Sequence, residues 1–526
     1  MVHSLQLRVD PRTAATPLLV KAQASTMLNV DANAICDVVV RKRSIDARQR
    51  RVMVNLTVDV YVGEAAPSAP LLKPVRYGEV TAAPQVVVVG AGPAGLFAAL
   101  RLIELGLRPV VLERGKDVDA RRVDMANIAR KDIVDPDSNY CFGEGGAGAF
   151  SDGKLYTRSK KRGNVEKVLQ IFCQHGASTD ILVDAHPHIG TDRLPVVIKA
   201  MRETIIMSGG EIHFGSRVTS LMLSDKDGAL HIGGVTTASG DTYMGPVILA
   251  TGHSARDTYR MLLDSGVAME PKGIAIGVRL EHPQQLIDAI QYHTPQGRGK
   301  YLPAAEYSML TRVDDRAVYS FCMCPGGFVI PSASGPGQQA VNGMSPASRG
   351  TKWANSGMVV EILPDDVTRY SGTLKIMQLQ EEIENAFYSE SGNTQNAPAQ
   401  RMTDFVAGRL STSLPPSSYA PGIHSARVDN ILPPFIAHRL RKGFEEFGRK
   451  SRGFLTDKAI VLGCETRTSA PVRIVRDDTS LCSVNVEGLF PSGEGAGYAG
   501  GIVSAAVDGE RAADALAMRI FNIQST

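Results

Sequence analysis

The chain is poor in cysteine, tryptophan and long apolar runs. Its 526 residues include seven cysteines and one tryptophan, so a disulfide framework is not expected. The longest apolar stretch, Val86–Leu100, contains three glycines and is too short to cross a bilayer. The first residues, MVHSLQLRVD, hold no apolar signal core. These absences predict a protein of the reducing cytoplasm without a membrane partner.

A strong excess of one charge is also lacking. Fifty-seven basic and 54 acidic residues give a net charge of +3, which makes no general case for a nucleic-acid partner. One local exception is the segment 41–51, where six basic residues accompany a single acid, Asp46. We interpret it as a solvated hairpin, and a contact for a polyanion such as RNA is the alternative.

The length and a hydrophobic content of 43% predict several globular units. Residues 1–75 have the pattern of a small α/β domain, which we expect to be ferredoxin-like. Within it we expect strands at 5–9, 35–40 and 52–62, and a helix at 14–28. A proline-dotted segment, 64–75, would link this domain to the rest. The remainder divides into expected units at 76–270, 271–455 and 456–526.

The second unit begins with a nucleotide-binding pattern. A run of four valines, Val86 to Val89, predicts a strand buried on both faces. Gly90-Ala91-Gly92-Pro93-Ala94-Gly95 follows, then an apolar helix at 96–105 and a strand at 109–112 that ends on Glu113. In such a unit the glycines allow a tight turn and a close approach of backbone to pyrophosphate. The helix N-terminus attracts the phosphates, and the acid accepts hydrogen bonds from the ribose.

The form GAGPAGL, with Glu113-Arg114 closing the second strand, resembles the FAD-binding fingerprint of the glutathione-reductase-like flavoproteins. Three other segments agree with it: 140–155, rich in glycine; 241–252, ending in Ala-Thr-Gly; and 485–501, with Gly493-Glu494 where that superfamily usually has Gly-Asp. A helix at 502–518 would point its N-terminus at the flavin. The glycine-rich loop has Ala147 and Ala149 where disulfide reductases place two cysteines, which excludes dithiol chemistry in that loop.

Over nearly its whole length, the chain resembles a family of uncharacterised FAD-dependent dehydrogenases found in bacteria and plastids. The motifs that carry this resemblance are KRSIDAR (42–48), FGEGGAGAFSDGKL (142–155), GHSARDTY (252–259), CMCPGG (322–327), ETRTSAPVRI (465–474) and PSGEGAGYAGG (491–501). The resemblance implies FAD as cofactor and leaves the substrate open. The residues expected to contact FAD are Gly90, Gly92, Pro93, Ala94, Gly95, Glu113, Arg114, Gly145, Gly146, Gly148, Gly252, Gly493, Glu494, Gly500, Gly501 and Ile502.

Three residues are candidates for the reaction itself. His253 follows the Ala-Thr-Gly turn and titrates near neutrality when unperturbed, although a capping or packing role is the alternative. Cys324, with Cys322, could be a flavin-facing thiol or half of a metal site, but strand packing is favoured and no partner motif completes a metal site. Arg467 offers a fork for an anionic substrate, with a structural Glu–Arg pair to Glu465 as the alternative.

The fold class expected is α/β: a FAD-binding, three-layer Rossmann-like domain with an inserted α+β substrate or cap domain. The expected function is hydride transfer between an organic substrate and flavin N5. A flavin-dependent monooxygenase is an alternative, and a FAD-binding sensor or RNA-associated flavoprotein is an alternative of another class. No second nucleotide-binding unit is evident, so NADH or NADPH would bind only transiently.

Overall fold

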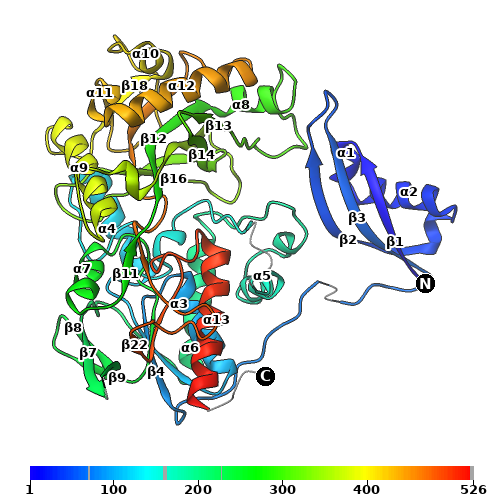
Figure 1. Cartoon of the computed structure of the whole chain (residues 1–526). Coiled ribbons are helices and arrows are strands. Elements are labelled where there is room, and N and C mark those ends of the chain that lie inside the picture. The colour runs from blue at the N-terminus through cyan, green and yellow to red at the C-terminus, as the bar shows by residue number, and fades with distance from the viewer. Residues whose placement is uncertain (69–70, 158–162, 227, 522–526) are drawn as a thin grey trace.

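The structure is a computed structural model that describes residues 1–68, 71–157, 163–226 and 228–521. Figure 1 shows a small N-terminal domain that an extended segment joins to a larger body. The larger body has a nucleotide-binding part and, above it in this view, a cap. None of the described helices is both long and apolar enough to cross a membrane.

The N-terminal domain packs its helices on one face of an antiparallel sheet. Within residues 1–68 the strand order is β1-β3-β2, and Leu56 and Val58 are buried against Val20 and Ala24 of the longest helix. The expected ferredoxin-like form is wrong, because no second helix–strand pair follows β3 in this part of the chain. The domain's elements are β1 (Val2–Val9), α1 (Pro11–Ala14), α2 (Pro17–Leu28), β2 (Ile35–Asp46) and β3 (Met53–Val62).

The basic segment forms the end of β2 and the hairpin that follows it. The hairpin turn lies beyond Asp46, because β2 keeps its pairing as far as Asp46 opposite Met53. Arg43 binds Asp184 of the larger body at 2.6 Å, and the carbonyl of Ala47 accepts a hydrogen bond from His293. The hairpin therefore also docks the N-terminal domain onto the rest of the molecule.

The nucleotide-binding part is built in three layers. Among the described residues its central sheet is parallel, with strand order β23-β10-β4-β5-β6. Val86 and Val88 face the helices, whereas Val87 and Val89 face a second, mixed sheet. The valine run is thus buried on both faces, as its sequence predicts, and the three-layer expectation is confirmed.

The helices α3 and α13 lie side by side against this sheet (Figure 1). The elements of the central sheet and its helices are β4 (Gln85–Val89), α3 (Pro93–Glu104), β5 (Arg108–Leu112), α4 (Val118–Lys131), α5 (Val165–Gln174), α6 (Leu194–Met207), β6 (Glu211–His213), β10 (Val247–Leu249), β23 (Leu489–Pro491) and α13 (Ile502–Ile520). The second sheet and the helix after β10 are β7 (Val218–Lys226), β8 (Ala229–Thr237), β9 (Thr242–Met244), β22 (Val486–Glu487) and α7 (Arg256–Asp264).

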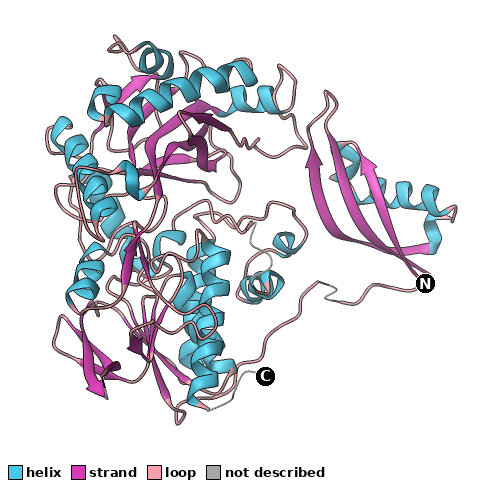
Figure 2. Cartoon of the chain, in the orientation of Figure 1, coloured by secondary structure: helices cyan, strands magenta, loops and turns pink. Residues whose placement is uncertain are grey.

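The cap is a mixed sheet with a helical layer outside it (Figure 2). Its described strands run in the order β13-β14-β17-β12-β20-β18-β19. Strand β20 belongs to this sheet, although the cap was expected to end at residue 455. Its buried apolar residues pair with β12 in the middle of the sheet. The cap elements are β12 (Ile274–Pro283), α8 (Gln284–Gln291), β13 (Leu310–Val313), β14 (Arg316–Cys324), β15 (Phe328–Pro331), β16 (Val341–Met344), β17 (Trp353–Ile362), α9 (Lys375–Glu390), β18 (Ala397–Arg401), α10 (Met402–Ala407), β19 (Ile423–Ser425), α11 (Val428–Ile431), α12 (Pro434–Lys450) and β20 (Ile460–Glu465).

The two chain segments that cross between cap and nucleotide-binding part run beside each other. Strand β11 (Met269–Pro271) pairs with β21 (Val472–Ile474) in antiparallel register. This pairing joins the start and the end of the cap at one place, beside Gly497 in the segment that follows β23. The cap is therefore held over the edge of the sheet where nucleotides bind in such folds.

Candidate cofactor and substrate site

A cavity of about 720 Å³ lies between the nucleotide-binding part and the cap. Its walls come from the carboxyl ends of β4, β5 and β10, the first turns of α3 and α13, the glycine-rich loop and the end of cap strand β14. The predicted cofactor residues that line it are Gly90, Gly92, Pro93, Ala94, Glu113, Arg114, Gly146, Gly148, Gly252, Glu494, Gly500, Gly501 and Ile502. Motifs that are far apart in the sequence therefore meet at one cavity.

The other predicted cofactor residues, Gly95, Gly145 and Gly493, are behind the wall. A Cβ on Gly95 would lie 1.8 Å from the carbonyl oxygen of Gly90, so this glycine allows α3 to pack on the turn before it. A Cβ on Gly145 would meet Ile198 at 2.4 Å. The amide of Gly493 donates to Asp508 at 2.7 Å. These three residues support the site without facing it.

At Gly92, neither the backbone conformation nor a close contact within the protein requires glycine. Its φ of −77° and ψ of −176° are extended backbone that any residue adopts. The nearest atom to a Cβ there is the Cα of Gly146, at 3.9 Å, which is an ordinary contact. A Cβ on Gly500 would have no heavy atom within 4 Å. Both missing side chains would instead occupy the cavity, as expected where a ligand approaches the backbone closely.

The helices α3 and α13, whose first turns line the cavity, begin without a side-chain cap. Gly92 precedes α3 and Gly501 precedes α13, and neither supplies an acceptor for the first N–H groups. Free N–H groups and the helix dipole make such a terminus attractive to negative charge. A dinucleotide carries phosphates at its centre and, when it is a reduced flavin, negative charge at the ring. The two helix ends thus fit the two anionic regions of reduced FAD.

Two acids, Glu113 and Glu494, line the same cavity in different surroundings. The Glu113 carboxylate is buried and accepts N–H groups from Ala91, Gly115 and Gly143 at 2.8 to 3.0 Å. A carboxylate has about four acceptor sites, so Glu113 has capacity for about one more donor. Glu494 has only partial exposure, and burial raises its pKa to about 7, with Lys272 opposing and Cys322 adding to the rise.

Arg114 also lines the cavity, next to Glu113 in the sequence. It binds Asp137 at 2.8 Å and Asp257 at 2.9 Å, and its guanidinium lies over the ring of Phe142, 4.2 Å from the centroid. Arg114 therefore fastens the glycine-rich loop to the strand that carries Glu113.

His253 lines the cavity directly after the turn that ends β10. Its Nδ1 is 3.0 Å from the hydroxyl oxygen of Ser254. Burial, together with the charges of Arg467 and Arg256, lowers the pKa of His253 to about 4. The expected titration near neutrality is therefore wrong: at neutral pH this imidazole is uncharged and can offer an N–H, but not a cationic acid.

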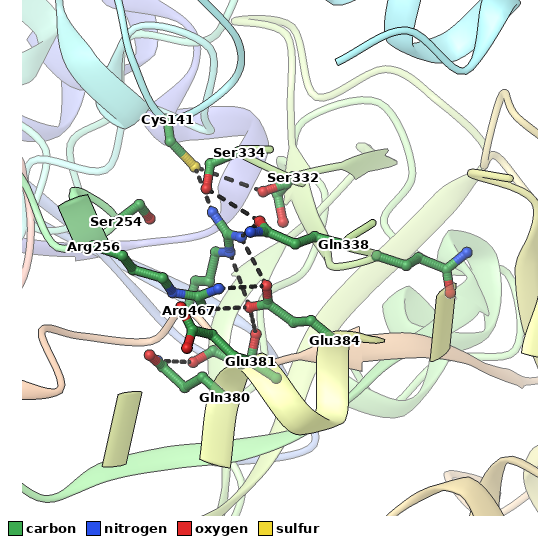
Figure 3. A network of polar contacts seen from close by, with 12 residues as sticks. Cys141, Ser254, Arg256, Ser332, Ser334, Gln338, Gln380, Glu381, Glu384 and Arg467 are labelled. Atoms are coloured by element: carbon green, nitrogen blue, oxygen red, sulfur yellow. Dashed lines mark hydrogen bonds and ion pairs between the residues drawn. The ribbon is translucent and has the colours of Figure 1, made fainter. Parts of the chain in front are cut away.

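Arg467 reaches the cavity, yet its guanidinium is already occupied. Figure 3 shows it against Glu384 of α9, together with Arg256 of α7. Arg467 Nη2 lies 2.8 Å from Glu384 and 2.7 Å from Gln338, and Nη1 lies 3.5 Å from the sulfur of Cys141. Arg256 binds the same carboxylate through two bonds of 2.8 and 3.0 Å. The free fork expected for an anionic substrate is thus not present at Arg467.

Glu384, which carries this network, is not among the residues predicted from the sequence. Burial alone would raise the pKa of Glu384, but the two guanidinium groups lower it to about 2. Its position on the buried face of a helix, four residues after Gln380, was the available signal. Arg467 does form a structural Glu–Arg pair, but its partner is Glu384. Glu465 binds Arg279 instead, at 3.1 Å.

The thiol that faces the cavity is Cys322, not the candidate Cys324. Cys324 is fully buried behind it, with its sulfur 3.4 Å from Arg279 Nη2. In the described residues no group of three or more histidine, cysteine or acidic side chains is arranged to hold a metal ion.

The cap-side end of the cavity is polar. His186 Nδ1 is 3.3 Å from Glu306, and this hydrogen bond raises the pKa of His186. Arg349 binds Glu306 at 2.6 Å and also pairs with the buried Asp152. Tyr156 lies against His186, with ring centroids 5.1 Å apart. This end has room and hydrogen-bonding groups beyond those of the nucleotide motifs.

Comparison with known proteins places family models on separate segments of the chain. Residues 83–128 match a family model described as a FAD binding domain, and residues 273–468 match one described as FAD-dependent protein, C-terminal domain-like. Residues 1–61 match a domain of unknown function. An uncharacterized protein of Clostridium beijerinckii is 40% identical over 505 residues, which is 93% of each chain.

Solved flavoprotein structures resemble the chain only distantly. A 3-ketosteroid Δ1-dehydrogenase from Sterolibacterium denitrificans has a TM-score of 0.36 and 11% identity, covering 82% of this chain and 99% of its own. A flavoprotein/dehydrogenase from Cytophaga hutchinsonii has a TM-score of 0.35 and 12% identity, covering 84% and 80%. TM-scores this low support no conclusion about activity. The family matches are decisive instead: the chain belongs, with the clostridial protein, to a family of FAD-dependent proteins, and its cofactor is FAD.

Proposed function

We propose that the protein is an oxidoreductase that transfers a hydride between an organic substrate and N5 of FAD inside the cavity described above. The observation that carries this proposal is the continuity of the cavity. One volume joins the uncapped starts of α3 and α13 to the end of cap strand β14 and the polar end at His186. A cofactor and a second molecule can therefore meet in it.

The residues around the cavity would divide the work of binding FAD. The N–H groups at the start of α3 would hold the pyrophosphate, and the remaining acceptor capacity of Glu113 would hold a ribose hydroxyl. Glu494, at the end of β23, would accept from or donate to the ribityl chain. When bound, FAD supplies the two-electron chemistry that no side chain of the protein can supply.

The remaining residues would support transfer by charge and by exclusion of water. The start of α13 would stabilise negative charge that develops on the ring. His253, uncharged at neutral pH, would offer a hydrogen bond without adding a positive charge. Phe321, Cys322 and Met323 form part of the cap-side wall of the cavity. This wall would limit the access of water to the reacting atoms.

The substrate proposed is a small organic molecule that enters at the His186 end. Arg467 already binds Glu384 and Gln338. Any anionic group on the substrate would therefore be met by His186 and Lys154, which also line the cavity. No nucleic-acid partner is proposed. Arg48 of the basic hairpin pairs with Asp46 at 2.8 Å, while Arg43 is used in docking.

Anaerobic mixing of the FAD-bound protein with NADH, NADPH and a panel of small organic donors tests this proposal. We expect at least one of them to bleach the flavin band about 100-fold or more faster than it bleaches free FAD, since the site would hold the reactants together. NADH or NADPH would act as a transient reductant. Bleaching no faster than that of free FAD by every compound would contradict the oxidoreductase proposal.

A further inference from the structure

Cap strand β14 ends at the cavity with two cysteines in an irregular backbone. The pairing of β14 with β17 shifts in register between Phe321 and Cys324. Cys322 has a φ of +42°, a conformation that is uncommon for a residue other than glycine and costs free energy. The shift places Cys322 in the cavity wall and Cys324 directly behind it, fully buried.

Side chains from two other elements hold this backbone in place. Arg279 of β12 is fully buried, and its Nη2 donates to the carbonyl of Cys322 at 2.8 Å and contacts the sulfur of Cys324 at 3.4 Å. Lys154, from the glycine-rich loop, donates to the carbonyl of Met323. A strained backbone persists where the surroundings determine it, and such places cluster at functional sites.

The same groups shift the pKa values of the two thiols in opposite directions. The thiol of Cys324 interacts with the sulfur of Cys322, and the charges of Lys154 and Arg279 add to it, so the pKa of Cys322 is lowered. The interaction with Cys322, together with burial, raises the pKa of Cys324. A thiol with a lowered pKa next to a thiol with a raised pKa is the arrangement from which thiol–disulfide chemistry proceeds.

We propose that Cys322 and Cys324 form a redox-active dithiol/disulfide pair that exchanges electrons with FAD in the cavity. On oxidation a bond forms between the two sulfurs, and the pair loses two electrons and two protons. The two electrons reduce bound FAD, which also takes up protons, so atoms and charge balance. The reverse step breaks the sulfur–sulfur bond with electrons from reduced FAD. This inference rests on the proposed position of FAD, but not on the identity of the organic substrate.

Packing alone explains less of this arrangement. Cys324 does fill a buried position, where its sulfur also lies 3.4 Å from the carbonyl of Cys322. A packing role gives no reason for a second sulfur in the cavity wall, in a strained conformation beside Lys154 and Arg279. By contrast, Cys173 is buried in a helix, where burial raises its pKa to about 11.

Reductive titration of the FAD-bound, air-oxidised protein with dithionite under anaerobic conditions tests the pair. FAD takes up about two electrons and a disulfide about two more. We expect about four electrons per FAD in the wild type, about two in Cys322→Ser and in Cys324→Ser, and about four in the control Cys36→Ser. Cys36 is exposed in the N-terminal domain, far from the pair in the sequence.

Mass spectrometry of the wild type gives an independent measurement that needs no variant to fold. The protein is treated with diamide, denatured in an alkylating reagent and digested. The expected result is a peptide in which Cys322 and Cys324 are both unalkylated and two hydrogens lighter, and which alkylates twice after prior reduction. Two alkylated thiols after oxidation, together with uptake of about two electrons by the wild type, would overturn the proposal. Absence of a flavin band would instead contradict the FAD site, while the thiol measurement would still report on the pair.

Discussion

Gly92→Val is expected to weaken FAD binding about 10- to 100-fold while leaving the fold of the apoprotein intact. The backbone at Gly92 is extended, and the one atom within 4 Å of a Cβ there is the Cα of Gly146, at an ordinary contact distance, so the protein backbone accommodates a Cβ at this position. The added methyl groups would occupy the place of the ligand, and overpacking of this kind costs about 1–3 kcal/mol. Fluorescence titration of the apoprotein with FAD measures the loss, and thermal unfolding of the apoprotein checks the fold.

Gly78→Val is the matched control. Gly78 is exposed, has no positive φ, and has no heavy atom within 4 Å of a Cβ position. Its variant should bind FAD like the wild type. If Gly92→Val also binds FAD like the wild type, the pyrophosphate does not approach this turn and the proposed orientation of FAD is wrong.

Glu384→Gln is expected to destabilise the FAD-bound protein by about 3 kcal/mol or more. The variant would leave Arg256 and Arg467 buried without their carboxylate (Figure 3), and breaking a buried ion pair on one side costs about 3–5 kcal/mol. Denaturant unfolding, followed by the loss of FAD and by circular dichroism, measures the change. Glu381→Gln on the same helix is the control, because its pair with Arg260 is partly exposed and should contribute about 1 kcal/mol or less.

The same carboxylate predicts a pH dependence. The pKa of Glu384 is lowered in the folded protein from 4.5 to about 2, so the unfolded chain binds its proton more readily. The stabilisation is fully present above pH 4.5 and is lost as the pH falls toward 2. The stability difference between wild type and Glu384→Gln should therefore stay constant from pH 5 to 8 and shrink in acid. A difference that grows as the pH falls would contradict the assignment of charge in this network.

The nucleotide-binding unit was predictable because its signals are local. Val86 to Val89, the glycines and Glu113 lie within one short stretch of sequence, and each has a conformational requirement that residue type alone reveals. The cap sheet gave no such signal. Its strands β12 and β20 pair across almost 190 residues of sequence, and the partner of each strand depends on packing that a single sequence does not display.

The site residues that sequence reasoning misplaced all depend on long-range contacts. Glu384, Arg256 and Arg467 come from three separate segments, so their network becomes visible only when the cap closes on the sheet. Alternation along a strand would place Cys322 and Cys324 on one face, but the register shift gives them different surroundings. The low pKa of His253 arises mainly from burial and then from the charge of Arg467, which lies in a segment far along the chain, with a further contribution from the nearby Arg256.

A crystal structure of the FAD-bound protein tests the central claim most directly: that the cavity between the sheet and the cap is the FAD site. We expect the pyrophosphate at the start of α3, beside Gly92, and the flavin ring between the start of α13 and Cys322. FAD bound elsewhere, or bound here with its ring turned away from Cys322 and His253, would contradict it.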